Sequence, residues 1–180
     1  MQRQAPSAIQ GTSPEVTLLP QLKSGQLLIV DAASQGGLIL CKPHHAEFVG
    51  GGAAIGGALD LDCQRVVPIG TVSILYSDCW WTRHQAYLAR SRWLLLLQKA
   101  TVEQVPLRRA QIILIWLTKK LGAATVAALP EELLGNLVGV FPQTMQMARS
   151  LVLSDDNPEL ADRPASIGRV QCGLEASWMT

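Results

Sequence analysis

The sequence has little charge and no excess of basic residues. Charged residues make up 16% of the 180 positions, and the formal net charge at pH 7 is +1. Proteins that bind nucleic acid usually carry a basic patch, so any such patch here must be local. Apolar residues reach 48%, which is enough for a packed core and argues against a globally disordered chain.

The sequence also lacks paired cysteines and long apolar runs. Its four cysteines are scattered, and no two have the CxxC spacing of zinc or iron–sulfur sites. The longest apolar runs, 93–97 and 112–117, hold five and six residues, whereas a membrane-spanning helix needs about 20. The first residues contain no apolar signal core. We therefore expect a soluble, cytoplasmic protein with reduced thiols and no membrane contact.

The N-terminal part predicts a small β unit. Residues 1–15 are polar and are expected to form a flexible leader. Over 16–81, short apolar segments alternate with glycine and sustain no helical period, which favours antiparallel strands. The expected strands are 26–31, 37–42, 46–49, 64–67 and 70–76. A loop of hairpin length, 32–36, predicts that the first two strands pair.

Residues 82–105 predict one long helix, because no glycine or proline interrupts them. One apolar face recurs every seven residues and consists of Trp81, Leu88, Leu95 and Val102. A second apolar face consists of Ala86, Trp93, Leu97 and Ala100. A helix with two apolar faces packs one against its own domain and offers the other to a partner, for instance a second copy. Burial of the whole helix within one chain is the alternative.

Residues 106–153 predict three further helices. Pro106 ends the long helix and opens the next one, 107–121, which ends in two lysines and a glycine. In 129–152, Gly135 is small enough for two helices to cross, Gly139 tolerates positive φ at a turn, and Pro142 suits the first turn of the second helix. This spacing fits a DNA-reading helix-turn-helix and a purely structural helix pair equally well.

The order of these parts resembles the Crp/Fnr family of bacterial transcription regulators. The resemblance is carried by Arg108-Arg109 through Gly122 and by Leu129 through Val152. Residues 23–28, 48–50 and 55–57 are similar to the family more weakly. It implies an α+β fold: a short antiparallel β roll, a long dimerisation helix and a C-terminal helix-turn-helix unit like a winged helix over 106–153. For the tail, 154–180, disorder is one interpretation. A homodimer would place the second helix of each motif in the DNA major groove and often contact RNA polymerase.

The residues expected to face DNA are Gln143, Thr144, Gln146 and Arg149 on the second helix, with Arg108 and Arg109 beside it. Glutamine pairs with adenine edges, threonine with a phosphate or a thymine methyl, and arginine with phosphate. From position 139 to the end, three arginines stand against five acidic residues. Binding is therefore expected to be weak unless Arg108, Arg109, Lys119 and Lys120 lie alongside the groove.

Other functions have less support in the sequence. No Gly-Glu…Arg-Ser/Thr phosphate cradle follows Gly56-Gly57, and Arg65 is the nearest cation, so we expect no cyclic nucleotide and no cofactor. Cys41, His44 and His45 could hold a metal or ligand only with a fourth donor, so no metal site is expected. No sequence motif supports a catalytic nucleophile, so we expect that the protein is not an enzyme. The main alternative is a relative that does not bind DNA and acts by protein association through 82–105.

Overall fold

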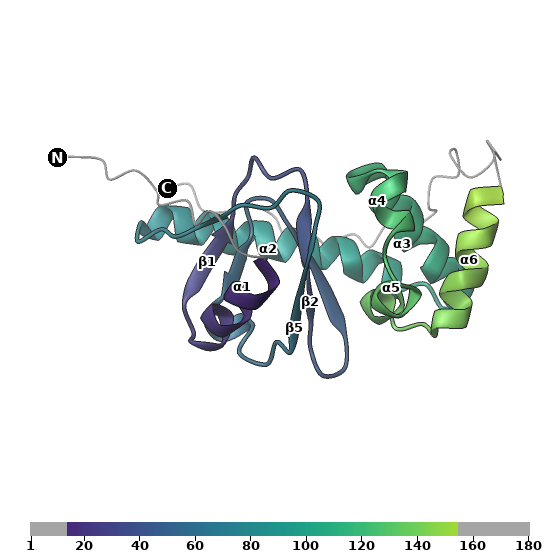
Figure 1. Cartoon of the computed structure of the whole chain (residues 1–180), viewed down its shortest axis with the longest axis horizontal. Helices are drawn as coiled ribbons and strands as arrows, with labels where there is room; N and C mark the ends of the chain where they lie inside the picture. The colour runs from purple at the N-terminus through teal and green to yellow at the C-terminus, as the bar shows by residue number, and fades with distance from the viewer. Residues whose placement is uncertain (1–13, 155–180) are drawn as a thin grey trace, which may run out of the picture.

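The computed structural model describes residues 14–154, so most of the expected tail and most of the expected leader lie outside the described residues. Within this range the protein is α+β, with six α-helices and six strands in two antiparallel three-stranded sheets. The sheets and the first helix (the sheet unit, residues 14–75) lie at one end of the molecule. The last four helices (the helical unit, residues 106–154) lie at the other end. Helix α2, Trp80–Thr101, runs along the sheets and reaches the helical unit with its C-terminal end (Figure 1).

The strands of the sheet unit form two layers. The first sheet has the order β4-β1-β6, with β4 Ala54–Gly56, β1 Leu27–Val30 and β6 Ile74–Leu75. The second has the order β3-β2-β5, with β3 Ala46–Gly50, β2 Gly37–Cys41 and β5 Arg65–Ile69. Each of the five predicted strands has a counterpart, although the expected strand 70–76 is reduced to Ile74–Leu75. Strand β4 is an addition that sequence patterns missed.

The expected pairing of the first two strands is wrong. β1 pairs with β4 and β6, whereas β2 pairs with β3 and β5, so residues 32–36 cross from one sheet to the other. The true hairpin is β2–β3, which closes at Cys41 and Ala46. The physical reason is burial on both faces: apolar side chains of β1 and β2, such as Val30 and Leu40, share one core between the sheets. A hairpin in a single sheet would leave one face of these strands in water.

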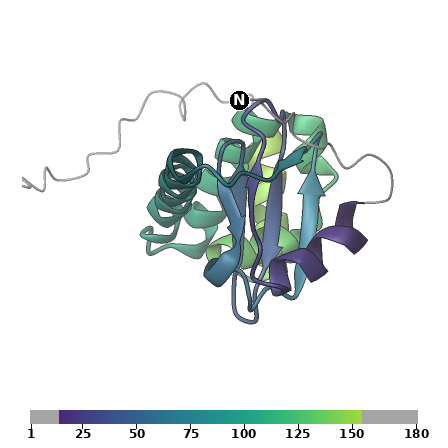
Figure 2. The same cartoon turned by 90° about the vertical axis from the view of Figure 1, so that its left-hand side faces the viewer.

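Helix α1, Pro14–Lys23, covers the end of the expected leader and the start of the expected β unit, where no helix was predicted. Leu18 and Leu22 stand four residues apart, so they share one helical face, and both are buried against the sheet core. Seen along the long axis, α1 and α2 cover opposite flanks of the sheets (Figure 2). This helix thus closes the sheet unit on the side that α2 leaves open.

Helix α2, Trp80–Thr101, packs through a narrow stripe. Ala86, Arg90, Leu97 and Ala100 are buried, and Trp93 is half-buried, so the second predicted apolar face does meet the body of the protein. The other predicted face is open to solvent. Its members, Trp81, Leu88, Leu95 and Val102, are 60%, 41%, 55% and 73% exposed. Complete burial of the helix within one chain is therefore wrong.

The helical unit consists of α3 Pro106–Leu121, α4 Ala123–Ala127, α5 Glu131–Val138 and α6 Pro142–Ser154. Three of these helices were predicted, and α4 was missed because it is only five residues long. Ile113, Leu117, Leu134 and Met145 are fully buried at the centre of the unit. The same core continues into Phe48 of β3, so the two units share one hydrophobic interior. No helix among residues 14–154 is both long and apolar enough to cross a bilayer.

Candidate nucleic-acid interface

Two glycines shape the junction of α5 and α6. A Cβ at Gly135 would lie 2.5 Å from the carbonyl oxygen of Val140, so only glycine allows this approach of the turn. Gly139 ends α5 in the left-handed region, with φ 66° and ψ 48°. The N–H of Val140 donates back to the carbonyl of Gly135 at 3.0 Å. The chain therefore reverses within three residues and enters α6 at Pro142.

Helix α6 presents two chemically different faces. Met145 and Ala148 are fully buried and join Leu134 and Val138 in the core. Gln143, Gln146 and Met147 are exposed, whereas Thr144 is half-buried. In Figure 1, α6 lies at the outer end of the helical unit, far from the sheets. The exposed face thus offers amide donors and acceptors on a helix that the core holds in place.

Arg149 does not face outward with these residues, which corrects the expected set of DNA contacts. Its Nη1 donates to the carbonyl of Ala127 and its Nη2 to the carbonyl of Leu129, both at 2.7 Å. The carboxylate of Glu131 lies 3.6 Å from its Nε, and the side chain is only 16% exposed. Arginine near a helix C-terminus satisfies carbonyls that the helix leaves free. Arg149 therefore joins α6 to the end of α4 and is not available to a phosphate.

Arg109 is also turned inward, which is a second correction. Its Nη1 donates to the carbonyl of Val138 at 3.3 Å, at the C-terminal end of α5. This bond places the first turn of α3 beside the turn that leads into α6. Arg108, one residue earlier, is exposed at the same end. Of the two arginines expected beside the DNA, only Arg108 keeps a free guanidinium in the described structure.

The two lysines at the end of α3 are both exposed. The ammonium of Lys120 lies 5.2 Å from the ring centroid of Trp93, so this side chain points toward the sheet unit and not along α6. The exposed surface of α5 and α6 carries Glu132 and, in the described part of the chain, no free cation of its own. Its electrostatic attraction for DNA is therefore small.

A buried ionic network, which sequence reasoning missed, fills the interior of the sheet unit next to α2. Arg90 reaches from α2 to the carboxylate of Glu47 and, at 3.0 Å, to Asp60 Oδ1. Its Nη1 also donates to the carbonyl of Ala54 at 3.2 Å. Lys42 Nζ lies 3.3 Å from Glu47 Oε1. A charged residue at position 90 falls on the same helical stripe as Ala86 and Leu97, and that placement was the available signal.

The network changes the acid–base behaviour of two of its members. Burial by itself would raise the pKa of Glu47, but Arg90, the hydrogen bond with His45 and the charge of Lys42 together lower it. Burial by itself would lower the pKa of Lys42, but Glu47, Asp60 and Asp62 outweigh it and raise the pKa. Each group is thus held in its charged form over a wider pH range than in water.

The network also holds the end of β4, because the N–H of Gly56 donates to Asp60 Oδ2 at 2.7 Å. Arg65 is exposed on β5 and is not part of the network. His45 is hydrogen-bonded to Glu47 at 3.1 Å. In the described part of the chain no three His, Cys, Asp or Glu residues gather as metal ligands.

No family model, curated protein or solved structure matches the chain. Its function is therefore inferred from the geometry of the described residues.

Proposed function

We propose that the protein is a cytoplasmic, non-enzymatic transcription regulator that binds double-stranded DNA as a homodimer. In this proposal α5 and α6 form a helix-turn-helix, and α6 enters the major groove. The observation that carries it is the two-faced α6: Met145 and Ala148 are buried in the core, and Gln143 and Gln146 project from the end of the molecule. A reading helix needs one face fixed in the core and polar side chains exposed on the other. The exposed face of α6 carries Met147 and Leu151 beside the two glutamines.

The exposed stripe on α2 supports the homodimer. Trp81, Leu88, Leu95 and Val102 repeat every seven residues, and each is at least 41% exposed. Such a repeat on an unpaired helix is typical of a coiled-coil seam, where a parallel partner brings each residue next to its own copy. A two-fold axis along α2 would present two copies of α6, which DNA requires at a spacing of about 34 Å. The resemblance to Crp/Fnr proteins adds RNA polymerase as an expected partner at promoters.

The DNA contacts proposed from the structure are fewer than those expected from the sequence. Gln143 and Gln146 face base edges, Thr144 lies at the edge of the exposed face, and Arg108 supplies a phosphate contact beside the turn. Arg109 and Arg149 instead donate hydrogen bonds to the carbonyls of Val138 and Ala127 and so face away from the proposed DNA contacts. Because so few cations are free, we expect weak affinity with a shallow dependence on salt.

Fluorescence anisotropy of the full chain with a labelled pool of random duplexes, enriched by selection, tests the proposal. We expect retained duplexes at low salt and a loss of affinity of about tenfold or more when Gln143 and Gln146 are both changed to alanine. The matched control is Gln64→Ala, on the exposed surface of the sheet unit. Failure to enrich any duplex, or equal binding by the double variant, would overturn DNA reading by α6.

Arg108→Ala tests the phosphate contact separately. We expect the slope of log K against log salt to fall by about 1 for each protomer, with sequence preference unchanged. Arg92→Ala, which removes an exposed arginine from α2, is the control. An unchanged slope in the Arg108 variant would remove this residue from the interface.

The inward arginines favour a second candidate function. A relative that does not bind DNA would act by pairing with another regulator through α2, and it would not need free cations on α6. If α2 forms the homodimer, Leu88→Glu together with Leu95→Glu should abolish self-association in analytical ultracentrifugation, whereas Leu61→Glu, at an exposed position of the sheet unit, should not. Assembly through α2 without any duplex binding would select the second function. A monomeric wild-type chain would contradict the homodimer.

A further inference from the structure

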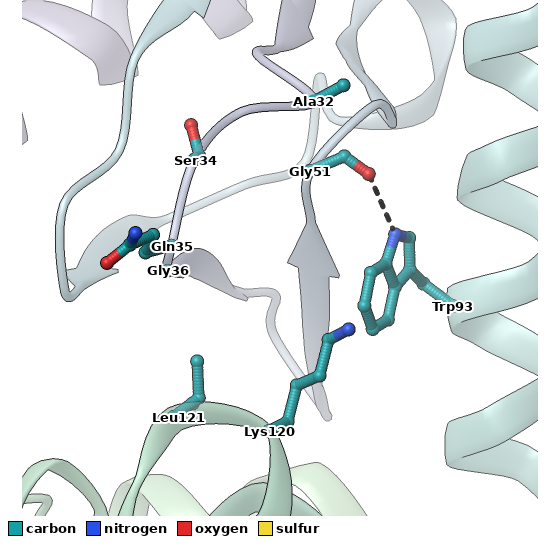
Figure 3. Close-up of a pocket in the computed structure, with 8 residues that line it drawn as sticks. All are labelled: Ala32, Ser34, Gln35, Gly36, Gly51, Trp93, Lys120 and Leu121. Carbon is teal, nitrogen blue, oxygen red and sulfur yellow. Dashed lines mark hydrogen bonds between the residues drawn. The ribbon is translucent and has the colours of Figure 1, made fainter.

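A cavity of about 480 Å³ opens where the two units and α2 meet. Ser34 and its neighbours in the loop between β1 and β2 form one side, and Gly51 and Trp93 form the second. Lys120 and Leu121, at the end of α3, form the third (Figure 3). Cavities that hold small ligands measure about 300–1,000 Å³. This one therefore has room for an organic molecule and lies apart from the network around Arg90.

The charge of the cavity comes from one side chain. Lys120 reaches into it with its ammonium 5.2 Å from the ring centroid of Trp93 (Figure 3). No acidic residue lines the cavity, and none of the ion pairs among residues 14–154 involves Lys120. An ammonium beside an aromatic ring and without a carboxylate is a binding group for an anion.

The indole wall of the cavity is rigid. Phe48 and Trp116 meet the ring of Trp93 edge-on, with centroids 5.5 and 6.0 Å away. A Cβ at Gly50 would lie 2.4 Å from this ring, so the indole presses directly on the backbone of β3. Its Nε1 donates to the carbonyl of Gly51 at 3.4 Å. The ring of Trp93 is therefore already fixed next to the ammonium of Lys120, so a ligand would lose little free energy by ordering it.

The loop between β1 and β2 lies opposite Lys120 and Leu121 across the cavity (Figure 3). The Oγ of Ser34 on this loop accepts the N–H of Ser73 at 3.1 Å and points away from Lys120, so it does not donate into the cavity. An ammonium beside a fixed ring suits a molecule with one negative group and an apolar body.

We propose that this cavity binds a small organic anion, with its carboxylate or phosphate on Lys120 and its apolar part against Trp93 and Leu121. The lining comes from both the sheet unit and the helical unit, so an occupant bridges them and stabilises their docking. The proposal needs neither DNA nor a second copy of the chain. It stands or fails independently of the function proposed above.

Thermal unfolding of the full chain with three probes tests the site. Phenyl phosphate and benzoate carry the two anionic groups on the same ring, and benzamide is the neutral analogue. At about 10 mM, we expect at least one anion to raise the Tm by about 3 °C or more and benzamide to have no effect. The anion with the larger shift identifies phosphate or carboxylate as the preferred group. No shift with either anion, or an equal shift with benzamide, would overturn the proposal.

Two neighbouring lysines provide matched variants. Lys120→Gln removes the charge in the cavity, and Lys119→Gln removes an exposed charge that does not line it. We expect Lys120→Gln to lose the anion-induced shift and Lys119→Gln to keep it, while both fold with similar Tm values in the absence of probe. Isothermal titration with the effective anion should then show a loss of affinity of about tenfold or more for Lys120→Gln only. Equal losses in both variants would show a general charge effect and refute the site.

Discussion

The sheet unit and the helical unit are held together by different kinds of contact. All three fully or nearly buried charged residues among positions 14–154, Glu47, Asp60 and Arg90, lie inside the sheet unit or on the helix that covers it. The buried residues at the core of the helical unit are apolar, and Gly135 allows the turn after α5 to approach closely. The sheet unit therefore needs matched charges in its interior, whereas the described part of the helical unit buries no charged residue fully.

This difference also shows how the two units rely on α2. The acidic side chains of the sheet unit receive their main partner, Arg90, from α2, so the sheets cannot satisfy their interior without that helix. The helical unit meets α2 chiefly through apolar side chains such as Leu97 and Ala100. Substitutions in the two units should therefore lower the free energy of unfolding for different physical reasons.

The largest effect is expected from Arg90→Ala. It leaves Glu47 and Asp60 buried without their guanidinium, and breaking a buried ion pair in this way costs about 3–5 kcal/mol. Urea unfolding of the variant measures the loss. Arg92→Ala, exposed on the same helix, should change stability by less than about 0.5 kcal/mol. A loss below about 1 kcal/mol for Arg90→Ala would mean that the network does not hold the sheet unit.

Gly135→Ala tests the fit of shapes in the helical unit. The new Cβ would lie 2.5 Å from the backbone oxygen of Val140, so the turn must move, at a cost of about 3 kcal/mol. Gly139→Ala meets no atom within 4 Å and should cost only the left-handed conformation, about 1–2 kcal/mol. Denaturant unfolding ranks the two variants. The reverse order would place the strain of this junction in the left-handed backbone of Gly139 and not in the contact of Gly135 with Val140.

Arg149→Ala should have a smaller effect, of about 1 kcal/mol, because it removes the donors to the carbonyls of Ala127 and Leu129 near the surface. Its Tm should fall while the salt dependence of any DNA binding stays the same. A reduced salt slope at unchanged Tm would return Arg149 to the DNA contacts and contradict the inward position of its guanidinium.

The smallest expected effect is the dependence of stability on pH through Glu47. Its pKa is lowered in the folded chain, so its contribution is complete above the ordinary pKa of 4.5 and is lost as pH falls through the folded value. Stability measured at about pH 7 and about pH 3 should therefore fall less in Glu47→Gln than in the wild type. Equal falls in the two proteins would show that Glu47 is not held ionised by Arg90 and Lys42.

Local patterns predicted most elements of both units. Five of six strands and helices α2, α3, α5 and α6 follow from glycine spacing and apolar periods that act within a few residues. Helix α1 was missed because Pro20 and a polar N-terminal neighbourhood mask the pair Leu18 and Leu22. The pairing of β1 was missed because strand partners are chosen by burial on both faces, which depends on segments distant in sequence.

The amino-acid sequence by itself determined the reversal at Gly135 and Gly139 and the two apolar faces of α2, since backbone conformation and helical periodicity are local properties. Only the tertiary structure decided where the long cationic side chains go. Arg90, Arg109, Arg149 and Lys120 are similar in sequence terms, yet one neutralises buried acids, two cap helices, and one faces a cavity. A flexible cation turns toward the nearest acceptor or ring, and folding chooses that neighbour from remote parts of the chain.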